Sequence, residues 1–404
     1  MSTTQKTCVA VLTGSGRSAV AVIGVAGPAA ESAVNRFFRA SNGRPMIQQP
    51  LGRIVYGHWG GDAGEDLVVC RREAEVVEIH CHGGAASISQ ILTNLKSAEC
   101  IEISWQRWVS DRLACSLMAE SQIALAGAST LRTAKILLDQ YHGALGRELR
   151  EIQGQLGNDS LEEAAERLEK LLATVEFGRH LTKPWRVVLA GFPNVGKSSL
   201  INALVGYQRA IVFDQPGTTR DVVSATTAAD GWPIQLSDTA GLHEAADELE
   251  SAGIAEAQHR LQDADLVLWI LDASQFKAGG EESVLEIARK QSLTAKARFD
   301  RSRVLVVVNK IDLLSGEMKP LCGAVVTCAV TKEGIAELLQ AIADRLVPCS
   351  PAEGAAISFT ERQVLLLEEA LARCQNGESD EAGDVLERLA VGCSDVSRPE
   401  GGAL

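Results

Sequence analysis

Eight consecutive residues, 191–198, constrain this chain more than any other stretch, because they fit a phosphate-binding pattern of two glycines, a lysine and a hydroxyl residue. Residues 186–190 before them predict a buried strand, and residues 199–204 after them predict a helix. A helix N-terminus presents free N–H groups that suit phosphate oxygens. We expect Lys197 to reach the β- and γ-phosphates and Ser198 to bind Mg²⁺. The expected nucleotide contacts in this loop are Asn194, Val195, Gly196, Lys197, Ser198 and Ser199.

Two further motifs offer the groups that a guanine-nucleotide switch needs around its γ-phosphate. Thr219 carries a hydroxyl that could complete the Mg²⁺ shell once a γ-phosphate is present. Asp238 follows an apolar run and can hold Mg²⁺ through a water, and the N–H of Gly241 can sense the γ-phosphate. The expected contacts from these stretches are Gly217, Thr218, Thr219, Asp238, Thr239, Ala240 and Gly241.

Residues 309–312 and 328–330 predict the choice of base. Guanine offers two adjacent N–H donors that match both oxygens of Asp312, whereas adenine lacks that pair. Residues 328–330 stand where a backbone N–H usually meets guanine O6. The predicted base site is Asn309, Lys310, Ile311, Asp312, Cys328, Ala329 and Val330.

Each motif also has a simpler interpretation: a glycine turn with an incidental lysine, a helix cap at Asp312, a turn residue at Thr219, a surface acid at Asp238. Any motif taken singly favours the simpler interpretation. Because five motifs come in the required order and each follows a predicted strand, together they predict a GTPase.

The hydrolytic groups differ from those of Ras-like switches. Leu242 stands where such switches carry a water-orienting glutamine, so another group must orient the attacking water. Asn194 could help to bind a monovalent cation in place of an arginine finger; a local cap is the alternative role for this residue.

Bulk properties narrow the class of protein. A chain of 404 residues is too long for a single hydrophobic core, so several domains are expected. Its content of 46% hydrophobic and 23% charged residues predicts a folded protein. The formal net charge of −13 argues against extensive sequence-independent binding to nucleic acid, so DNA is not expected as a partner.

The first apolar stretch is too short for a signal peptide or membrane span, which predicts a cytoplasmic protein. The ten cysteines form no CxxC pair, so we expect free buried thiols rather than disulfides or zinc ligands.

Hydrophobic patterning divides the chain into four segments. Residues 1–97 alternate β-branched runs with glycine turns, which predicts a small α+β domain. Residues 98–183 have helix-forming composition, with a capping box expected at Ser160. Residues 184–349 carry continuous apolar runs, typical of the doubly wound, mostly parallel sheet of a Ras-like P-loop GTPase domain. Residues 350–404 return to helix and end in a loose tail. The predicted fold is a multidomain α/β protein whose helical domain is interrupted by the GTPase domain.

These motifs resemble the tRNA modification GTPase MnmE (TrmE) family. The resemblance rests on residues 191–204, 210–221, 238–250, 16–17, 76–84 and 359–363. It implies G domains that pair in a K⁺-dependent manner and a homodimer formed through an N-terminal domain that resembles folate-binding folds. It also implies an FAD-containing partner and modification of wobble uridine at C5 in tRNA.

Carried over by position, Glu250 would orient the attacking water through a second water and complete a catalytic set with Lys197 and Thr219. Asn194 would be a K⁺ ligand. The potassium loop implied by the resemblance comprises Phe213, Asp214, Gln215, Pro216, Gly217 and Thr218, with Phe213, Gln215 and Thr218 in the K⁺ site.

The chain also departs from the family. Its last residues, 398–404, lack the family's cysteine-containing tail, which leaves open a regulatory GTPase that binds GTP and dimerises without modification chemistry. A ribosome-assembly GTPase of the Era or Der type is a further alternative, which the N-terminal motifs and the potassium-loop sequence disfavour. Glu78 aligns with an acid of the family's folate site, but Gly24 stands at the expected arginine. A glycine cannot pair with a folate carboxylate, which argues against folate as a cofactor.

Overall fold

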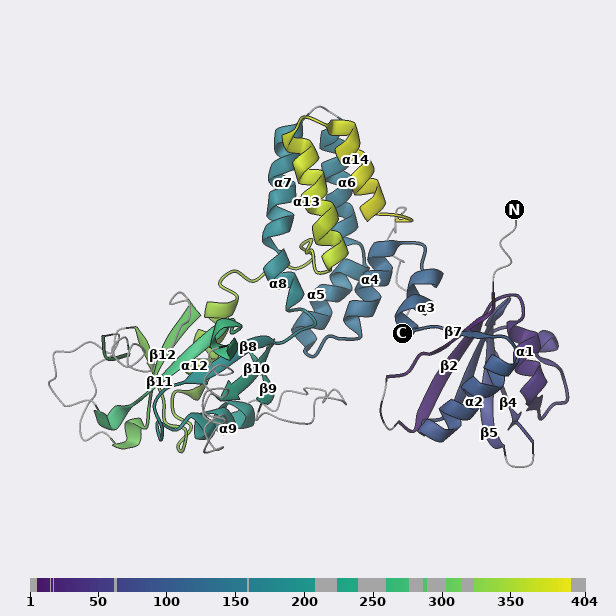
Figure 1. Ribbon diagram of the computed structural model, residues 1–404, viewed down its shortest axis with the longest axis horizontal. Coiled ribbons are helices and arrows are strands. Elements are labelled where there is room, and N and C mark those ends of the chain that lie inside the picture. The colour runs from purple at the N-terminus through teal and green to yellow at the C-terminus, as the bar shows by residue number, and fades with distance from the viewer. Residues whose placement is uncertain are drawn as a thin grey trace. The chain divides into compact units, whose positions relative to one another are not determined.

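The computed structural model of this chain describes residues 6–14, 16, 18–61, 64–157, 160–207, 224–238, 259–275, 286–288, 303–313 and 323–393. The chain divides into two compact units, Met1–Ala114 and Cys115–Leu404 (Figure 1). Within the described residues, no helix is both long and apolar enough to cross a lipid bilayer.

The first unit is a seven-stranded sheet backed by two helices. Its strand order is β3-β4-β5-β6-β2-β1-β7, antiparallel except for the β1–β7 pair. Alternate residues of the strands, such as Ile23 and Ile79, bury one face beneath Val34 of α1 and Ile91 of α2, which confirms the predicted α+β class. The elements are β1 (Cys8–Val11), β2 (Val20–Ala26), α1 (Ala30–Phe37), β3 (Phe38–Ala40), β4 (Ile54–Trp59), β5 (Glu65–Glu73), β6 (Val76–His82), α2 (Ala85–Ser97), β7 (Ile101–Glu102) and α3 (Trp105–Arg112).

This unit extends beyond residue 97, the boundary expected from the sequence. β7 pairs in parallel with β1, and Trp108 of α3 packs against Ala10 and Val76. A two-residue strand followed by an eight-residue helix leaves too little periodicity to be assigned to a sheet from sequence alone.

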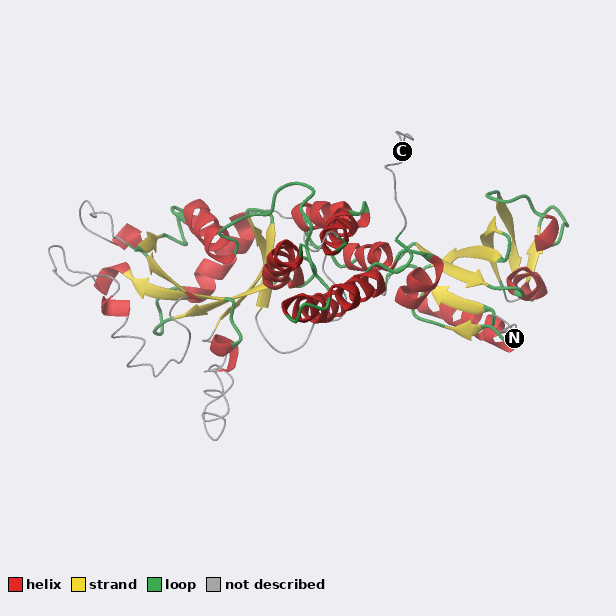
Figure 2. Ribbon diagram, turned by 90° about the horizontal axis from the view of Figure 1, so that it is seen from above, coloured by secondary structure: helices red, strands yellow, loops and turns green. Residues whose placement is uncertain are grey.

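The predicted GTPase domain of the second unit is built on a six-stranded sheet with helices on its faces (Figure 2). The order β13-β12-β11-β8-β10-β9 is parallel except for the edge pair β9–β10. All seven residues of β11 are buried, as its continuous apolar run predicts. The elements are β8 (Trp185–Ala190), α9 (Lys197–Tyr207), β9 (Ser224–Ala229), β10 (Trp232–Asp238), β11 (Leu266–Asp272), β12 (Val304–Asn309), β13 (Ala324–Val326) and α12 (Ile335–Leu346).

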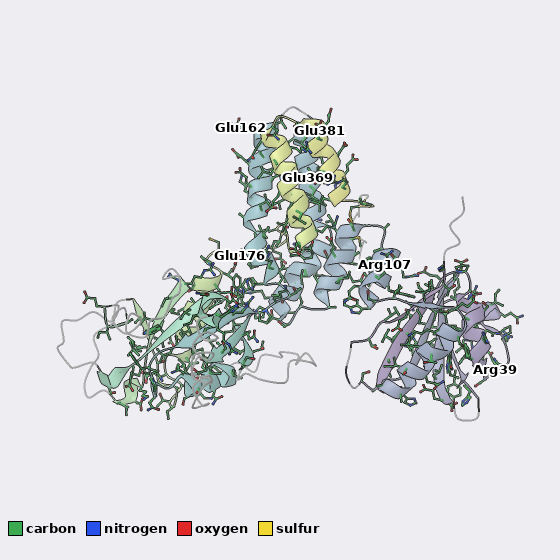
Figure 3. The ribbon with its side chains drawn as sticks, in the orientation of Figure 1. Arg39, Arg107, Glu162, Glu176, Glu369 and Glu381 are labelled. Atoms are coloured by element: carbon green, nitrogen blue, oxygen red, sulfur yellow. A yellow bond between two sulfur atoms is a disulfide. The ribbon has the colours of Figure 1, made fainter. Side chains whose placement is uncertain are left out.

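The helices on either side of this domain in the sequence pack into one bundle. Helices α6, α7, α13 and α14 lie side by side (Figure 1) around a core that includes Leu149, Leu168, Leu367 and Leu386. Acidic side chains such as Glu162 project from the bundle into solvent (Figure 3). This arrangement confirms a helical domain interrupted by the GTPase domain. The elements are α4 (Ser116–Leu125), α5 (Leu131–Tyr141), α6 (Ala144–Leu156), α7 (Leu161–Ala173), α8 (Val175–Arg179), α13 (Glu361–Gln375) and α14 (Ser379–Leu389).

Two local predictions are wrong. Ser160 makes no side-chain cap, because its ψ of 55° lies outside the extended region that orients a capping hydroxyl. A capping box that was not expected lies at Thr360 and Gln363, at the start of another helix, α13. Cys115 and Cys393 form a disulfide rather than staying free. The bundle brings their Cα atoms to 4.4 Å although 278 positions separate them, a proximity that sequence spacing does not reveal.

Candidate nucleotide-binding site

The loop between β8 and α9 has a backbone that glycine alone can adopt at two points. Gly191 has φ +148° and Gly196 has φ +93°. A Cβ would lie 2.5 Å from the carbonyl oxygen of Ile270 at the first and 2.4 Å from Nδ2 of Asn309 at the second. Asn194 is also left-handed, at φ +64°, a conformation that asparagine tolerates better than most residues. Turns of this kind direct backbone N–H groups inward and bind anions.

Lys197 closes the loop with its ammonium group. Its Nζ donates hydrogen bonds to the carbonyl oxygens of Gly191, at 3.0 Å, and Phe192, at 3.1 Å. Burial lowers the pKa of Lys197, although nearby Asp238 acts in the opposite direction. The loop therefore encloses a desolvated positive charge, which suits phosphate oxygens.

A hydroxyl and a carboxylate meet at the first turn of α9. Ser198 Oγ donates to Oδ2 of Asp238 at 2.9 Å, and Asp238 is buried where β10 ends. Oxygen donors of these two types are the ligands that Mg²⁺ prefers. Ser198 and Asp238 thus fit a Mg²⁺ site, where the ion would neutralise phosphate charge.

Asn309 connects three of the predicted motifs. Its side-chain amide donates from Nδ2 to the carbonyl oxygen of Val195 at 3.0 Å. Its Oδ1 accepts from Thr327 Oγ1 at 3.3 Å and from the N–H of Ala329 at 3.2 Å. Because this side chain is only 1% exposed, its bonds are shielded from water and fix the phosphate loop to the strands that precede the predicted base site.

Asp312, the predicted base-reading residue, lies exposed in a short 3₁₀ turn at residues 311–313. One of its oxygens, Oδ1, accepts a hydrogen bond from the buried thiol of Cys328 at 3.0 Å. Val330, by contrast, is 85% exposed. The structure thus brings Asp312, Cys328 and Ala329 together at the carboxyl edge of the sheet.

The sequence interpretation missed Asp272, the last residue of β11. Lys310 Nζ contacts Oδ2 of Asp272 at 2.8 Å and also donates to the carbonyl oxygen of Asn194. Burial acts to raise the pKa of Asp272, but hydrogen bonds from Lys310 and Ser274 outweigh it and lower the pKa. An acid ending an apolar strand beside the phosphate loop was the available signal.

Several predicted site residues lie outside the described residues. They are Phe213, Asp214, Gln215, Pro216, Gly217, Thr218, Thr219, Thr239, Ala240, Gly241 and Glu250.

The first unit does not fit a folate carboxylate at the position that the resemblance suggests. Gly24 of β2 lies opposite Glu78 of β6. A Cβ on Gly24 would stand 2.6 Å from Cζ2 and 2.7 Å from Cη2 of Trp108, which is 7% exposed. The indole therefore occupies the space that an arginine side chain would need.

Comparison with known proteins finds a family match for the N-terminal domain and another for the domain that carries the predicted nucleotide site. Residues 7–106 match the family model "GTP-binding protein TrmE N-terminus", and residues 186–310 match "50S ribosome-binding GTPase". The tRNA modification GTPase MnmE of Geobacillus thermodenitrificans (strain NG80-2) is 32% identical over 387 residues, covering 84% of this chain and 81% of that protein. The chain belongs to the MnmE family.

A second relative covers nearly the whole chain, and a solved structure covers less than half of it. The MnmE of Carboxydothermus hydrogenoformans (strain ATCC BAA-161 / DSM 6008 / Z-2901) is 29% identical over 448 residues, covering 98% of this chain and 95% of that protein. The solved G domain of the T. maritima FeoB iron transporter is 27% identical, covers 41% of this chain and 97% of that one, and has a TM-score of 0.27. As a member of the MnmE family, this chain is a GTP-hydrolysing enzyme that uses Mg²⁺.

Proposed function

We propose that this MnmE-family GTPase works in the cytoplasm as a K⁺-stimulated homodimer that serves wobble-uridine modification at C5 in tRNA, together with an FAD-dependent partner. The observation that carries the GTPase part is the buried side chain of Asn309, which joins the phosphate loop to the base-binding strands. The tRNA part is supported by relatives named tRNA modification GTPases.

The described residues have distinct tasks in this proposal. Lys197 exchanges its bonds with loop carbonyls for bonds with phosphate oxygens, and Ser198 and Asp238 hold Mg²⁺ together with Thr219. Asp312 accepts the two N–H groups of guanine. Lys310 keeps the phosphate loop in place through the carbonyl oxygen of Asn194.

The remaining tasks come from the family resemblance. Glu250 orients the attacking water through a second water. K⁺ binds in place of an arginine finger, which would explain why Leu242 stands where a catalytic glutamine is found elsewhere. The proposed K⁺ ligands are Asn194, Phe213, Gln215 and Thr218.

A kinetic experiment tests the hydrolytic part. GTP turnover should be faster in KCl than in NaCl at equal ionic strength, and equal rates would contradict the proposed K⁺ site. Glu250→Ala should slow turnover while GTP affinity stays near wild type. Loss of GTP binding in this variant would mean that Glu250 is structural.

A nucleoside experiment tests the biological part. Mass spectrometry of tRNA from a deletion strain, with and without the restored gene, should show loss and recovery of the C5-modified wobble uridine. Normal modification in the deletion strain, in the absence of a redundant homologue, would favour the alternative of a regulatory GTPase. The match of residues 7–106 to the TrmE N-terminal model favours the MnmE family over an Era- or Der-type ribosome-assembly GTPase.

A further inference from the structure

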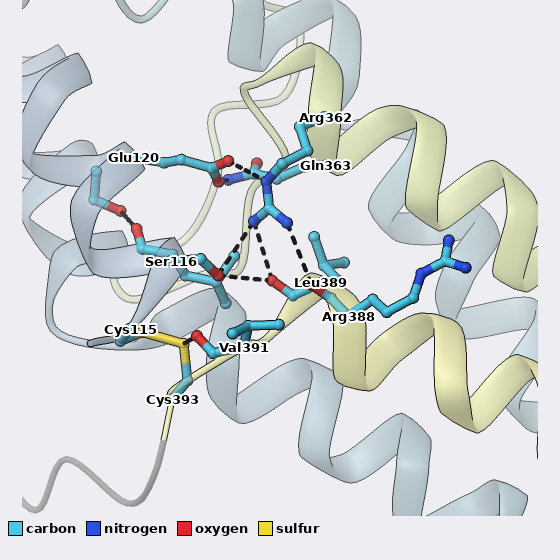
Figure 4. Close-up of a disulfide and its surroundings, with 11 residues drawn as sticks. Cys115, Ser116, Glu120, Arg362, Gln363, Arg388, Leu389, Val391 and Cys393 are labelled. Carbon is cyan, nitrogen blue, oxygen red and sulfur yellow. Dashed lines mark hydrogen bonds and ion pairs between the residues drawn. A yellow bond between two sulfur atoms is a disulfide. The ribbon is translucent and has the colours of Figure 1, made fainter. Parts of the chain in front are cut away.

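The disulfide joins the two ends of the helical domain (Figure 4). Cys115 is the N-cap residue of α4, and Cys393 follows α14. Cys115 is 7% exposed and packs in the bundle core, whereas Cys393 is partly exposed at its edge. The bond therefore fastens the end of the second helical segment to the beginning of the first.

Non-covalent bonds hold the same junction without the disulfide. The N–H of Ser116 donates to the carbonyl oxygen of Val391 at 3.0 Å, and Ser116 Oγ donates to that of Leu389 at 3.0 Å. Arg362 Nη2 donates to the carbonyl oxygen of Leu389 at 3.1 Å and is anchored by an ion pair with Glu120. Because these bonds secure the chain as far as Val391, we expect the bundle to stay folded when the disulfide is cleaved.

The surroundings of Cys115 favour its thiolate. The N-terminus of the ten-residue helix α4 stabilises negative charge at its N-cap. A small cavity of about 20 Å³ beside the disulfide is lined by both cysteines and by two cationic residues, Arg147 and Arg150. A stabilised thiolate makes Cys115 the better leaving group in thiol exchange.

Four other cysteines contrast with this pair. Burial raises the pKa of Cys8, Cys81, Cys100 and Cys374, so their reactive thiolate forms are scarce. Cys349 is exposed and unpaired with any other cysteine, which makes it a matched control.

We infer that Cys115 and Cys393 form a redox-active pair that exchanges with low-molecular-weight thiols. The thiolate of one such molecule attacks the more exposed sulfur of Cys393, the disulfide breaks, and the electron pair leaves on Cys115 as a thiolate. A second thiol molecule attacks the mixed disulfide, regenerates the Cys393 thiol and departs as the oxidised small-molecule disulfide. The reverse sequence, with that disulfide as oxidant, restores the bond.

This inference rests on the proposed function in one respect: tRNA modification takes place where thiols are kept reduced, and disulfides there are usually transient or regulatory. In such a compartment a permanent structural disulfide is not expected. A disulfide that opens and closes with the redox state of the small-molecule thiols is the expected kind.

A glutathione titration of the full-length native protein tests the inference. After equilibration at graded ratios of reduced to oxidised glutathione, free thiols are alkylated and quantified by peptide mass spectrometry. Cys115 and Cys393 should lose their disulfide together, as a single two-electron couple, while Cys349 remains outside any intramolecular bond. A disulfide that persists in excess reduced glutathione until the protein is denatured would overturn the inference. Failure of Cys115 and Cys393 to form a disulfide in oxidised glutathione would also overturn the inference.

Variants separate the chemistry from general destabilisation. Reduction should lower the melting temperature of the wild type by several degrees and leave Cys393→Ser and Cys115→Ser unchanged, whereas Cys349→Ser should respond like the wild type. An equal response in all variants would contradict the assignment. Because the titration needs neither GTP nor tRNA, its failure is distinguishable from failure of the proposed function.

Discussion

The thiol of Cys328 donates a hydrogen bond to Oδ1 of Asp312, with 3.0 Å between sulfur and oxygen. The thiol is completely buried, while the carboxylate lies at the surface where a base can reach it. A fixed donor on one oxygen restricts the orientation of the whole carboxylate. Cys328 is therefore a positioning residue for Asp312, the group that we propose distinguishes guanine from adenine.

Replacing this donor should reduce the preference for GTP. In Cys328→Ala the carboxylate of Asp312 loses its partner, and we expect GTP affinity to fall roughly fivefold, the equivalent of about 1 kcal/mol. Cys328→Ser keeps a donor and should stay near wild type. Calorimetric titration measures the affinities of each variant for GTP and for ATP. Cys374→Ala, which removes a buried thiol in the helical bundle, is the control for lost packing. Unchanged GTP affinity in Cys328→Ala would contradict the positioning role.

A methyl group at Gly196 should disable the phosphate loop. The residue has φ +93°, and an added Cβ would lie 2.4 Å from Nδ2 of Asn309. Gly196→Ala therefore combines backbone strain of about 1–3 kcal/mol with a displaced Asn309. We expect nucleotide affinity at least tenfold weaker by calorimetry. Gly206→Ala, at a helical position with open space around it, should bind normally, and equal affinities in the two variants would show that the loop tolerates a side chain.

The parts of the site predicted from sequence are those that carry local chemical signals. The phosphate loop, Asn309 and Asp312 each follow an apolar run, so parallel-sheet geometry places them at one edge. The bond from Lys310, directly after β12, to Asp272, the last residue of β11, depends on side-chain reach, which no spacing encodes.

For the fold, too, the sequence predicts local elements but not the contacts between distant segments. The apolar run of β11 predicts a strand buried on both faces, and all its residues are buried. The Cys115–Cys393 bond depends on where two distant helical segments meet, and the extension of the first unit to Ala114 depends on a two-residue strand. Such long-range contacts leave no periodic pattern in the chain.

Half-buried His180 should make the second unit less stable in mild acid. Its ring stacks on Trp185 with centroids 3.6 Å apart, and burial lowers its pKa below the ordinary 6.5 although Asp265 and Glu176 act in the opposite direction. Between the lowered folded pKa and 6.5, the unfolded chain binds the proton more tightly, so this contribution to stability is lost as pH falls through that window.

The comparison variant is His180→Phe, which keeps a stacking ring without a titrating group. Between about pH 7.5 and pH 5.5, the melting temperature of the wild type should fall further than that of the variant. His259→Ala, which removes an exposed histidine of the same unit, should follow the wild type. Parallel melting curves for wild type and His180→Phe would rule out His180 as the source.

The indole of Trp108 should keep formyl-tetrahydrofolate from binding beside Glu78. Gly24 offers no cation, and Trp108 fills the space in which a cation-bearing side chain would stand. We expect equilibrium dialysis to detect no saturable binding to the full chain, with GTP binding to the same sample as the positive control. Trp108→Ala opens space without adding charge and should not bind either, whereas the double variant Gly24→Arg, Trp108→Ala supplies both and should gain measurable affinity. Saturable binding to the wild type would show that the ligand uses other residues than this β2–β6 pair.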